Sequence, residues 1–292
     1  MNILVIGGTR FFGVPMVERL LQRGERVTIA TRGLARDGFG NRVERLRLDL
    51  REEDSVRSAL RGRQFDVVID KMGYCSNEMR WILESLECGR FLHMSTAGVY
   101  RLEGMDIPEE AFNGAEGDLL WCGRQELDYD SVKRNAERAL CQVYRDRNWV
   151  SVRAPFVLGR NDYTGRLRFY VEHVLRGKPM WIDDLRARFC VAECDELADF
   201  FVFLTYSALT GAVNACSAGT ISLEELLRYV EERSGVAPIL EPDGDPAPYN
   251  GMMDNSLSTK KAAAAGFRFR DVHEWIYRLL DDYIDEVRSG RE

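Results

Sequence analysis

Two side chains whose types and spacing suit proton transfer are Tyr129 and Lys133, which begin and end a Tyr-Asp-Ser-Val-Lys run. Residues four apart share one face of an α-helix. An ammonium beside a phenol favours the phenolate, so we expect Lys133 to lower the pKa of Tyr129 from its usual value of about 10. A phenol tuned in this way exchanges a proton with a carbinol oxygen while hydride moves at the carbon.

A glycine-rich turn near the start of the chain has the sequence Gly-Gly-Thr-Arg-Phe-Phe-Gly over residues 7–13. It follows the apolar run 3–6 and precedes a helical pattern, which is the context of a dinucleotide-binding fingerprint. Gly7 allows a tight turn, and Gly13 lets the helix pack closely on the strand. Free N–H groups at the start of the helix would face a pyrophosphate. The residues predicted to bind the dinucleotide here are Gly7, Thr9, Arg10, Phe11, Phe12 and Gly13.

The residues that follow the second apolar run indicate which dinucleotide is bound. A site specific for NAD usually has an acidic residue about 20 positions after the glycines, which bonds the ribose 2′-hydroxyl. Residues 27–33 read Val-Thr-Ile-Ala-Thr-Arg-Gly, with Arg32 and no acid. A guanidinium suits a phosphate dianion. Arg10 and Arg32 therefore predict NADP, with NAD as the second choice; the alternative is that both are solvated surface arginines.

Polar residues also follow two later strand patterns. Asp49 and Leu50 come after the run 43–48 and are candidates to border the adenine, while the alternative for Asp49 is a helix cap. Ser95 and Thr96 follow the run 91–94. Because ligands of parallel α/β sheets bind at the C-terminal ends of the strands, we expect these hydroxyls near the site.

Alternating strands and helices must position these residues. We predict strands over 3–6, 27–30, 43–48, 65–69, 91–94 and 150–153, and helices from about Pro15 and over 54–60, 79–86 and 129–147. Repeated strand–helix units indicate an α/β fold with a doubly wound parallel sheet. After Pro155 the alternation breaks. We predict a dinucleotide-binding domain over 1–158, to which 190–215 returns, and a smaller C-terminal substrate lobe over 159–189 and 216–292.

Composition narrows the classes of partner and location. The 292 residues carry a formal net charge of −7, which disfavours binding to nucleic acid. No apolar run reaches the roughly 20 residues of a membrane span, and the run 3–6 is too short for a signal peptide. Seven cysteines, an odd number, indicate reduced thiols in a cytoplasm. Cys190 and Cys194 lack further ligands at zinc spacing, so we predict no metal site.

Together these motifs resemble the short-chain dehydrogenase/reductase superfamily, in its extended NAD-dependent epimerase/dehydratase branch. The resemblance rests on the turn at 7–13, Asp49-Leu50, Ser-Thr-Ala-Gly-Val-Tyr at 95–100, Tyr129 and Lys133, Arg-Ala-Pro-Phe-Val-Leu-Gly at 153–159, and Glu-Leu-Ala at 196–198. It implies a Rossmann fold. The Gly-Gly-Thr-Arg-Phe form is similar to a divergent subgroup that includes epimerase-like bacterial proteins and chloroplast stem-loop RNA-binding proteins.

The resemblance also implies roles for individual residues. Tyr129 would be the acid/base, and Lys133 would hold the nicotinamide ribose. Thr96, with Ser95 as the alternative, would bind the reacting oxygen. The residues that would pass beside the nicotinamide are Pro155, Phe156 and Val157.

The implied function is that of an NAD(P)-dependent epimerase/dehydratase acting on a sugar-like or nucleotide-sugar substrate. The alternatives are an NADPH-dependent carbonyl reductase and a non-catalytic NADP-sensing or RNA-binding protein. Family members commonly form homodimers through the helix that carries the tyrosine and the lysine. The apolar stripe on that helix has a second interpretation as ordinary core packing; it consists of Val132, Ala136, Leu140 and Val143.

Overall fold

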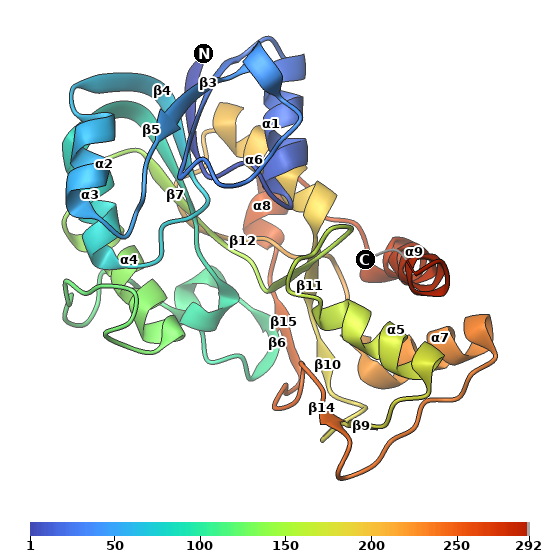
Figure 1. The fold of residues 1–292 in the computed structure, drawn as a ribbon. Helices are drawn as coiled ribbons and strands as arrows, with labels where there is room; N and C mark the ends of the chain where they lie inside the picture. The colour runs from blue at the N-terminus through green and yellow to red at the C-terminus, as the bar shows by residue number, and fades with distance from the viewer. Residues whose placement is uncertain (291–292) are drawn as a thin grey trace.

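A seven-stranded parallel sheet forms the centre of the larger lobe in the computed structural model, which describes residues 1–290 (Figure 1). Its strand order is β12-β7-β5-β4-β1-β2-β3. The strands are β1 (Asn2–Ile6), β2 (Arg26–Thr31), β3 (Glu44–Arg47), β4 (Arg63–Asp70), β5 (Leu86–Met94), β7 (Trp149–Arg153) and β12 (Gly211–Asn214). The chain runs outward from β1 in one direction and from β4 in the other. This reversal creates a crevice between the C-terminal ends of β1 and β4, where ligands of such sheets bind.

Helices cover both faces of the sheet, as the sequence predicts. On one face lie α1 (Gly13–Gln22) and α6 (Cys194–Tyr206), which pack against each other. On the other face lie α2 (Glu53–Leu60), α3 (Ser76–Ser85) and α4 (Tyr129–Gln142). The predicted α/β fold with a doubly wound parallel sheet is confirmed, because continuous apolar strands such as 3–6 are buried on both faces.

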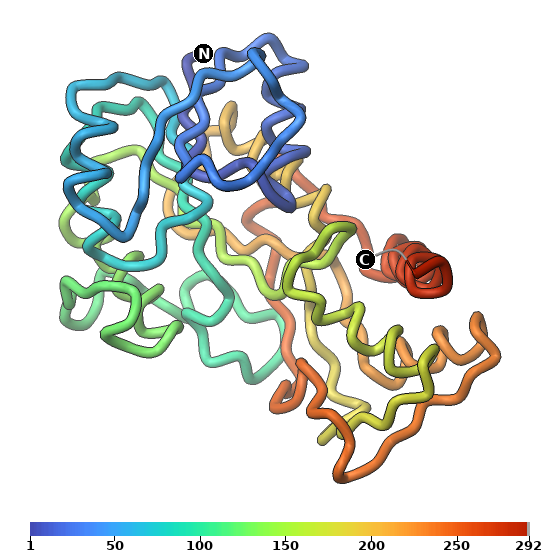
Figure 2. The backbone as a smooth tube through the Cα atoms, viewed as in Figure 1, coloured from blue at the N-terminus to red at the C-terminus, as the bar shows by residue number. Residues whose placement is uncertain are grey.

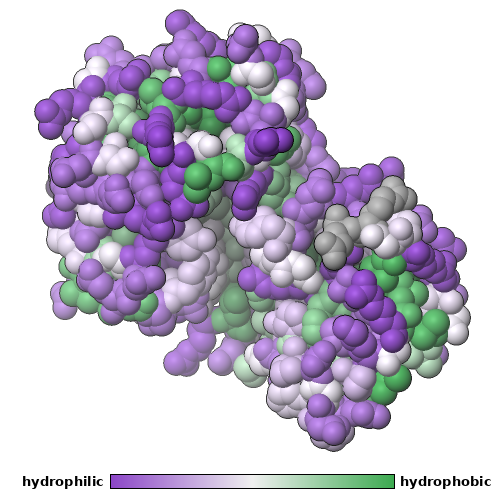
Figure 3. Space-filling model, viewed as in Figure 1, coloured by the Kyte–Doolittle hydropathy of each residue, from purple (hydrophilic) through white to green (hydrophobic). Residues whose placement is uncertain are grey.

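A smaller lobe packs beside the sheet and has its own apolar core (Figure 2). Its helices are α5 (Arg166–Arg176), α7 (Leu223–Ser234) and α9 (Ile276–Arg288). Its short strands are β8 (Phe156–Leu158), β9 (Met180–Trp181), β10 (Arg188–Phe189), β11 (Val191–Glu193), β13 (Ile221–Ser222) and β14 (Asp245–Pro246). The surface is hollowed between the two lobes (Figure 3).

Several short elements lie outside the central sheet and the main helices. They are β6 (Gly104–Ile107), β15 (Asn255–Leu257), α8 (Lys260–Ala264) and four 3₁₀ turns, η1 (Gly40–Arg42), η2 (Ala97–Val99), η3 (Glu109–Ala111) and η4 (Val272–Glu274). Strand β15 pairs with β6, although about 150 residues separate them in sequence. Ala262 of α8 is fully buried in the core that contains α1 and α6, so the chain returns to the sheet a second time after 190–215.

Helix α4 is shorter than predicted. It ends at Gln142 instead of near residue 147, and Val143 is 51% exposed. Val132, Ala136 and Leu140 are buried, so core packing explains those three members of the stripe but not Val143. Within residues 1–290, no helix is both long enough and apolar enough to cross a bilayer.

Candidate functional site

The glycine turn between β1 and α1 has the backbone geometry that its sequence requires. Gly7 and Gly8 have φ angles of 102° and 93°, in the left-handed region that favours glycine. A Cβ atom on Gly13 would lie 2.7 Å from the Cα atom of Gly8, so a side chain there would push the helix away from the turn. The turn is tied to β2 by the Gly7 N–H, which donates to the Ala30 carbonyl at 2.9 Å.

The N-terminal end of α1 presents free donors. Within the described chain, the backbone N–H groups of Phe11 and Phe12 meet no acceptor, whereas the Gly13 N–H already donates to the Arg10 carbonyl at 3.1 Å. Aligned peptide dipoles add a partial positive charge at this end of the helix. The end of α1 therefore suits a phosphate group.

A cavity of about 380 Å³ opens beside this turn, at the crevice between β1 and β4. The predicted residues that line it are Gly7, Thr9, Arg10, Arg32, Asp49 and Leu50. Residues that the sequence interpretation missed also line it, among them Lys71, Met72, Arg124 and Tyr163. Another hollow, of about 560 Å³, lies between α1 and α6 and contains none of the predicted site residues. The smaller cavity is therefore the candidate dinucleotide site.

Arg10 and Arg32 line this cavity, and among residues 1–290 neither guanidinium forms an ion pair within 4 Å. Asp49 is different, because Arg51 donates to its carboxylate at 2.5 Å and holds its pKa at about 2, with a further contribution from Arg32. The Asp49 carboxylate also accepts from the Arg51 backbone N–H at 3.1 Å. Asp49 thus borders the cavity and orders the turn before α2. The alternative prediction of a helix cap is wrong, because Glu52 is the N-cap residue of α2.

Thr96 and Tyr129 are brought together at the C-terminal end of β5. The Thr96 hydroxyl accepts from the Gly98 N–H at 3.1 Å and caps η2, which fixes the direction of its side chain. Asp128 caps α4 by accepting from the Ser131 N–H at 3.0 Å, and Tyr129 is the first residue of that helix. Tyr129 is 51% exposed, and the Thr96 side chain lies near enough to its phenol to lower the pKa of that phenol.

The expected effect of Lys133 on Tyr129 is wrong. Desolvation raises the pKa of Tyr129, and the nearby Thr96 side chain only partly opposes this rise. The Lys133 amine is buried and donates instead to the carbonyls of Gly73 and Met94, at 2.7 and 2.9 Å. Desolvation lowers the pKa of this amine to about 8.

Tyr74 lies against both members of the predicted pair. The Lys133 amine is 4.6 Å from the centre of the Tyr74 ring, and the rings of Tyr74 and Tyr129 meet edge-on at 5.9 Å. The Arg124 guanidinium lies 4.5 Å from the same ring centre. The Tyr74 ring thus contacts both Lys133 and Tyr129, and the Lys133 amine itself bonds to the backbone after β4 and at the end of β5.

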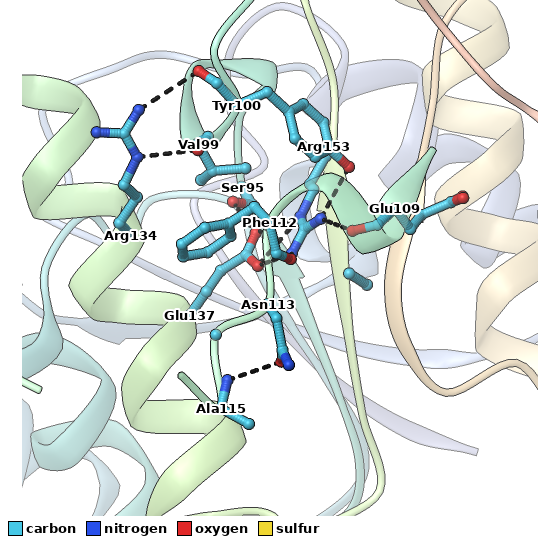
Figure 4. A network of polar contacts seen from close by, with 12 residues as sticks. Ser95, Val99, Tyr100, Glu109, Phe112, Asn113, Ala115, Arg134, Glu137 and Arg153 are labelled. Carbon is cyan, nitrogen blue, oxygen red and sulfur yellow. Dashed lines mark hydrogen bonds and ion pairs between the residues drawn. The ribbon is translucent and has the colours of Figure 1, made fainter. Parts of the chain in front are cut away.

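Ser95 points away from Tyr129, which argues against its predicted role as an alternative to Thr96. Its hydroxyl donates to a Glu137 carboxylate oxygen at 2.5 Å, inside a buried polar network with Arg153 and Tyr100 (Figure 4). Neighbouring residues of an extended segment point to opposite sides. Thr96 therefore faces the candidate site, and Ser95 belongs to the interior.

The segment 155–157 lies outside the cavity lining. Phe156 begins β8, pairs with Val191 of β11, and stacks near Tyr249 with ring centres 4.9 Å apart. The Arg166 guanidinium lies 5.1 Å from the Phe156 ring centre. Pro155, Phe156 and Val157 thus lie at the junction of the lobes, separate from the glycine turn.

A doubly wound sheet with a glycine turn, free helix N–H groups and a cavity at the strand reversal defines a dinucleotide-binding fold. These residues also fit a dinucleotide chemically, because unpaired cations and N–H donors surround the cavity.

Comparisons with known proteins agree with this class. A model of the NAD dependent epimerase/dehydratase family matches residues 3–82. The UDP-glucose 4-epimerase of Thermus thermophilus, solved with NAD, is 25% identical with a TM-score of 0.72 and covers 98% of this chain and 99% of its own. The first 82 residues thus match the NAD dependent epimerase/dehydratase family, and the whole chain is similar in sequence and fold to a solved epimerase.

Two further proteins are similar to this chain. The UDP-glucose 4-epimerase of Thermotoga maritima, solved with UDP-glucose, has a TM-score of 0.77 at 16% identity over the full length of both chains, which shows the shared fold. The chloroplast stem-loop binding protein of 41 kDa b from Arabidopsis thaliana is 26% identical over 262 residues, which are 78% of this chain. The match spans 66% of the length of that relative.

Proposed function

We propose that this protein is an NAD(P)-dependent epimerase/dehydratase-type oxidoreductase with Tyr129 as its acid/base. The observation that carries the proposal is that the Tyr74 ring contacts both Tyr129 and the Lys133 amine, with Thr96 nearby, at the same edge of the sheet as the dinucleotide cavity. A bound nicotinamide would supply the hydride acceptor and donor. The acid/base would exchange a proton with the substrate oxygen, and Thr96 would orient that oxygen by a hydrogen bond.

Lys133 has a different part in this scheme. Its amine holds the loop after β4 through the Gly73 carbonyl and the end of β5 through the Met94 carbonyl. It therefore fixes the two segments between which the substrate oxygen and the ribose would lie. A ribose hydroxyl that replaced one of these carbonyls would bring the ammonium closer to Tyr129 and lower the pKa of the phenol.

We propose NADP as the preferred cofactor, with NAD as the second choice. The support is the absence of an acid over 26–33 and the two cavity-lining arginines, Arg10 and Arg32, neither of which has a carboxylate partner among residues 1–290. Relatives solved with NAD support a dinucleotide of this type in general. The 2′-phosphate is the group that would distinguish the two.

The proposed substrate is a nucleotide-sugar, which the smaller lobe would hold across the hollow between the lobes. The support comes from relatives solved with UDP-glucose or UDP-glucuronic acid. We also propose a cytoplasmic homodimer. The proposed domain division keeps 1–158 with 190–215 and 159–189 with 216–292, except that Ala262 and its neighbours join the first domain.

The test is a hydride-transfer assay with the purified protein, NAD or NADP, and a panel of UDP-sugars. Exchange between 4-epimers without net change in cofactor absorbance would support an epimerase, whereas stoichiometric NADPH consumption with a carbonyl substrate would support the alternative of a reductase. Failure of both assays, with a cofactor bound, would leave the proposed chemistry without support.

A second candidate, a non-catalytic RNA-binding protein that senses NADP, is favoured by the similarity to the stem-loop binding protein. A gel-shift titration with a structured RNA at two salt concentrations tests it. Phosphate contacts would weaken binding steeply with salt. The net charge of −7 predicts no shift at physiological salt.

A further inference from the structure

Lys71 is the first residue after β4 and lies beside the glycine turn. Ile6 pairs with Asp70 in the sheet, and the Lys71 N–H donates to the Ile6 carbonyl at 3.1 Å. The side chain then lies alongside the start of α1, where its amine is 4.6 Å from the centre of the Phe12 ring. The ammonium therefore lies beside the residue that precedes α1, and Lys71 lines the same cavity as the glycine turn.

This ammonium has no counter-ion in the chain. Among residues 1–290, no carboxylate and no hydrogen-bond acceptor contacts the Lys71 amine. The charged and titratable groups that act on it are Arg10 from the glycine turn and Cys194 from the start of α6. Desolvation, reinforced by Arg10, lowers the pKa of Lys71 to about 8.

A partly buried ammonium without a partner costs stability, because desolvation of an ion is unfavourable unless another charge compensates it. Two positive features lie side by side here, Lys71 and the N-terminal end of α1, and the charge of Arg10 also acts on Lys71. Their mutual repulsion is relieved by an anion that binds from outside the chain.

We propose that Lys71 is a phosphate-binding residue, which shares the pyrophosphate of the dinucleotide with the N–H groups of Phe11 and Phe12. The inference rests on the dinucleotide site of the proposed function. It assigns Lys71 to a group that ADP, NAD and NADP have in common. Arg10 and Arg32 are assigned instead to the 2′-phosphate, which only NADP carries.

Calorimetric titration of the full chain with ADP, NAD, NADP and adenosine tests the assignment. Lys71→Met keeps the length of the side chain and removes its charge, and it is expected to weaken ADP, NAD and NADP about tenfold or more each. Adenosine, which has no phosphate, should bind as it does to the wild type. Lys71→Arg should stay within about threefold of the wild type, since it restores the charge.

Lys178→Met is the matched control, because Lys178 is an exposed lysine of the smaller lobe that does not line the cavity. It should bind every ligand as the wild type does. Thermal unfolding should show that Lys71→Met is folded, since the substitution removes a desolvated charge without leaving a carboxylate unpaired.

Proton uptake gives a readout that is independent of affinity. A bound pyrophosphate would raise the pKa of Lys71, so at pH 8 binding should take up about half a proton per ligand, and at pH 6.5 almost none. Titrations in buffers of different ionisation enthalpy measure this uptake. The step should be present in the wild type and absent from both Lys71→Met and Lys71→Arg.

Each other outcome overturns the inference in a distinguishable way. Wild-type affinity of Lys71→Met for all ligands would leave the proposed function intact and remove Lys71 from the site. A loss confined to NADP would move Lys71 to the 2′-phosphate, and an equal loss for adenosine would make its role structural. If the wild-type protein binds none of the phosphate ligands, the proposed function fails and this inference fails with it.

Discussion

In the sheet lobe, the buried Arg153 and the cations at the dinucleotide cavity differ in whether the chain itself pairs them with a carboxylate. Arg153, on β7, is 1% exposed and donates to the Glu137 carboxylate at 2.5 Å, to the Tyr100 hydroxyl at 2.8 Å and to the carbonyls of Glu109 and Phe112 at 2.7 and 3.0 Å (Figure 4). Every part of its guanidinium is satisfied inside the chain. Lys71 and the two cavity arginines have no such carboxylate partner within residues 1–290.

This difference distinguishes a cation that stabilises the fold from cations that are available to bind a ligand. Burial alone would raise the pKa of Glu137, but the charge of Arg153 and its hydrogen bonds hold that pKa below its usual value. The ion pair joins β7 to α4, and Ser95 joins the same carboxylate to the end of β5. The network therefore holds Thr96 and Tyr129 in register without contacting a ligand. The cavity cations form no ion pair within residues 1–290, so an anion that binds there would compensate their charges.

Arg153→Leu should produce the largest effect, because it leaves the Glu137 carboxylate buried and unpaired. We expect the free energy of unfolding to fall by about 3–5 kcal/mol, measured by urea denaturation. The double variant Arg153→Leu/Glu137→Leu should recover part of this loss, since it removes both buried charges. A loss below about 1 kcal/mol for the single variant would show that Arg153 is not the architectural cation described above.

Tyr129→Phe should change chemistry and leave stability and cofactor binding unchanged, because it removes only the proton that the phenol exchanges. We expect turnover in the hydride-transfer assay to fall about a hundredfold or more. Tyr206→Phe, which removes a phenol on α6 away from both the cavity and Thr96, is the control and should retain turnover. Undiminished turnover of Tyr129→Phe would exclude Tyr129 as the acid/base.

The sheet and the glycine turn could be predicted because their signals are local. A buried parallel strand is continuously apolar, and a left-handed turn requires glycine. The end of α4 could not be predicted in the same way, because no glycine or proline follows Gln142 at the point where the helix stops. Tyr144 instead turns back into the core, where it is 8% exposed.

The direction of side chains at the site also required the structure. Ser95 and Thr96 are adjacent hydroxyl residues, and only the strand register decides which of them faces Tyr129. Lys133 has the predicted spacing, but its amine donates to a carbonyl of the loop after β4 and to the carbonyl at the end of β5. Lys71 was missed because, in the sequence alone, a single lysine after a strand cannot be distinguished from an ordinary surface lysine. Its position after an apolar run, at the ligand-binding edge of the sheet, is the signal that could have identified it.

Arg10→Ala and Arg32→Ala test the cations that form no ion pair in the chain. Of the predicted changes, their effects on cofactor affinity should be the smallest. Each should weaken NADP about tenfold, or about 1.4 kcal/mol, and leave NAD within about twofold, because only NADP carries the 2′-phosphate. Neither should lower the unfolding temperature of the free protein by more than a few degrees, since neither arginine forms an ion pair within 4 Å or a side-chain hydrogen bond among residues 1–290.

Titration calorimetry of both variants with both cofactors measures the difference directly. Equal losses for NADP and NAD would place the arginines at the pyrophosphate, beside Lys71, and would make NAD the equal of NADP as the cofactor. Unchanged affinity for both cofactors would show that both arginines are solvated surface residues without a role in binding. A selective loss of NADP affinity would complete the contrast with Arg153. An arginine would then stabilise the fold where it forms an ion pair and select the cofactor where it forms none.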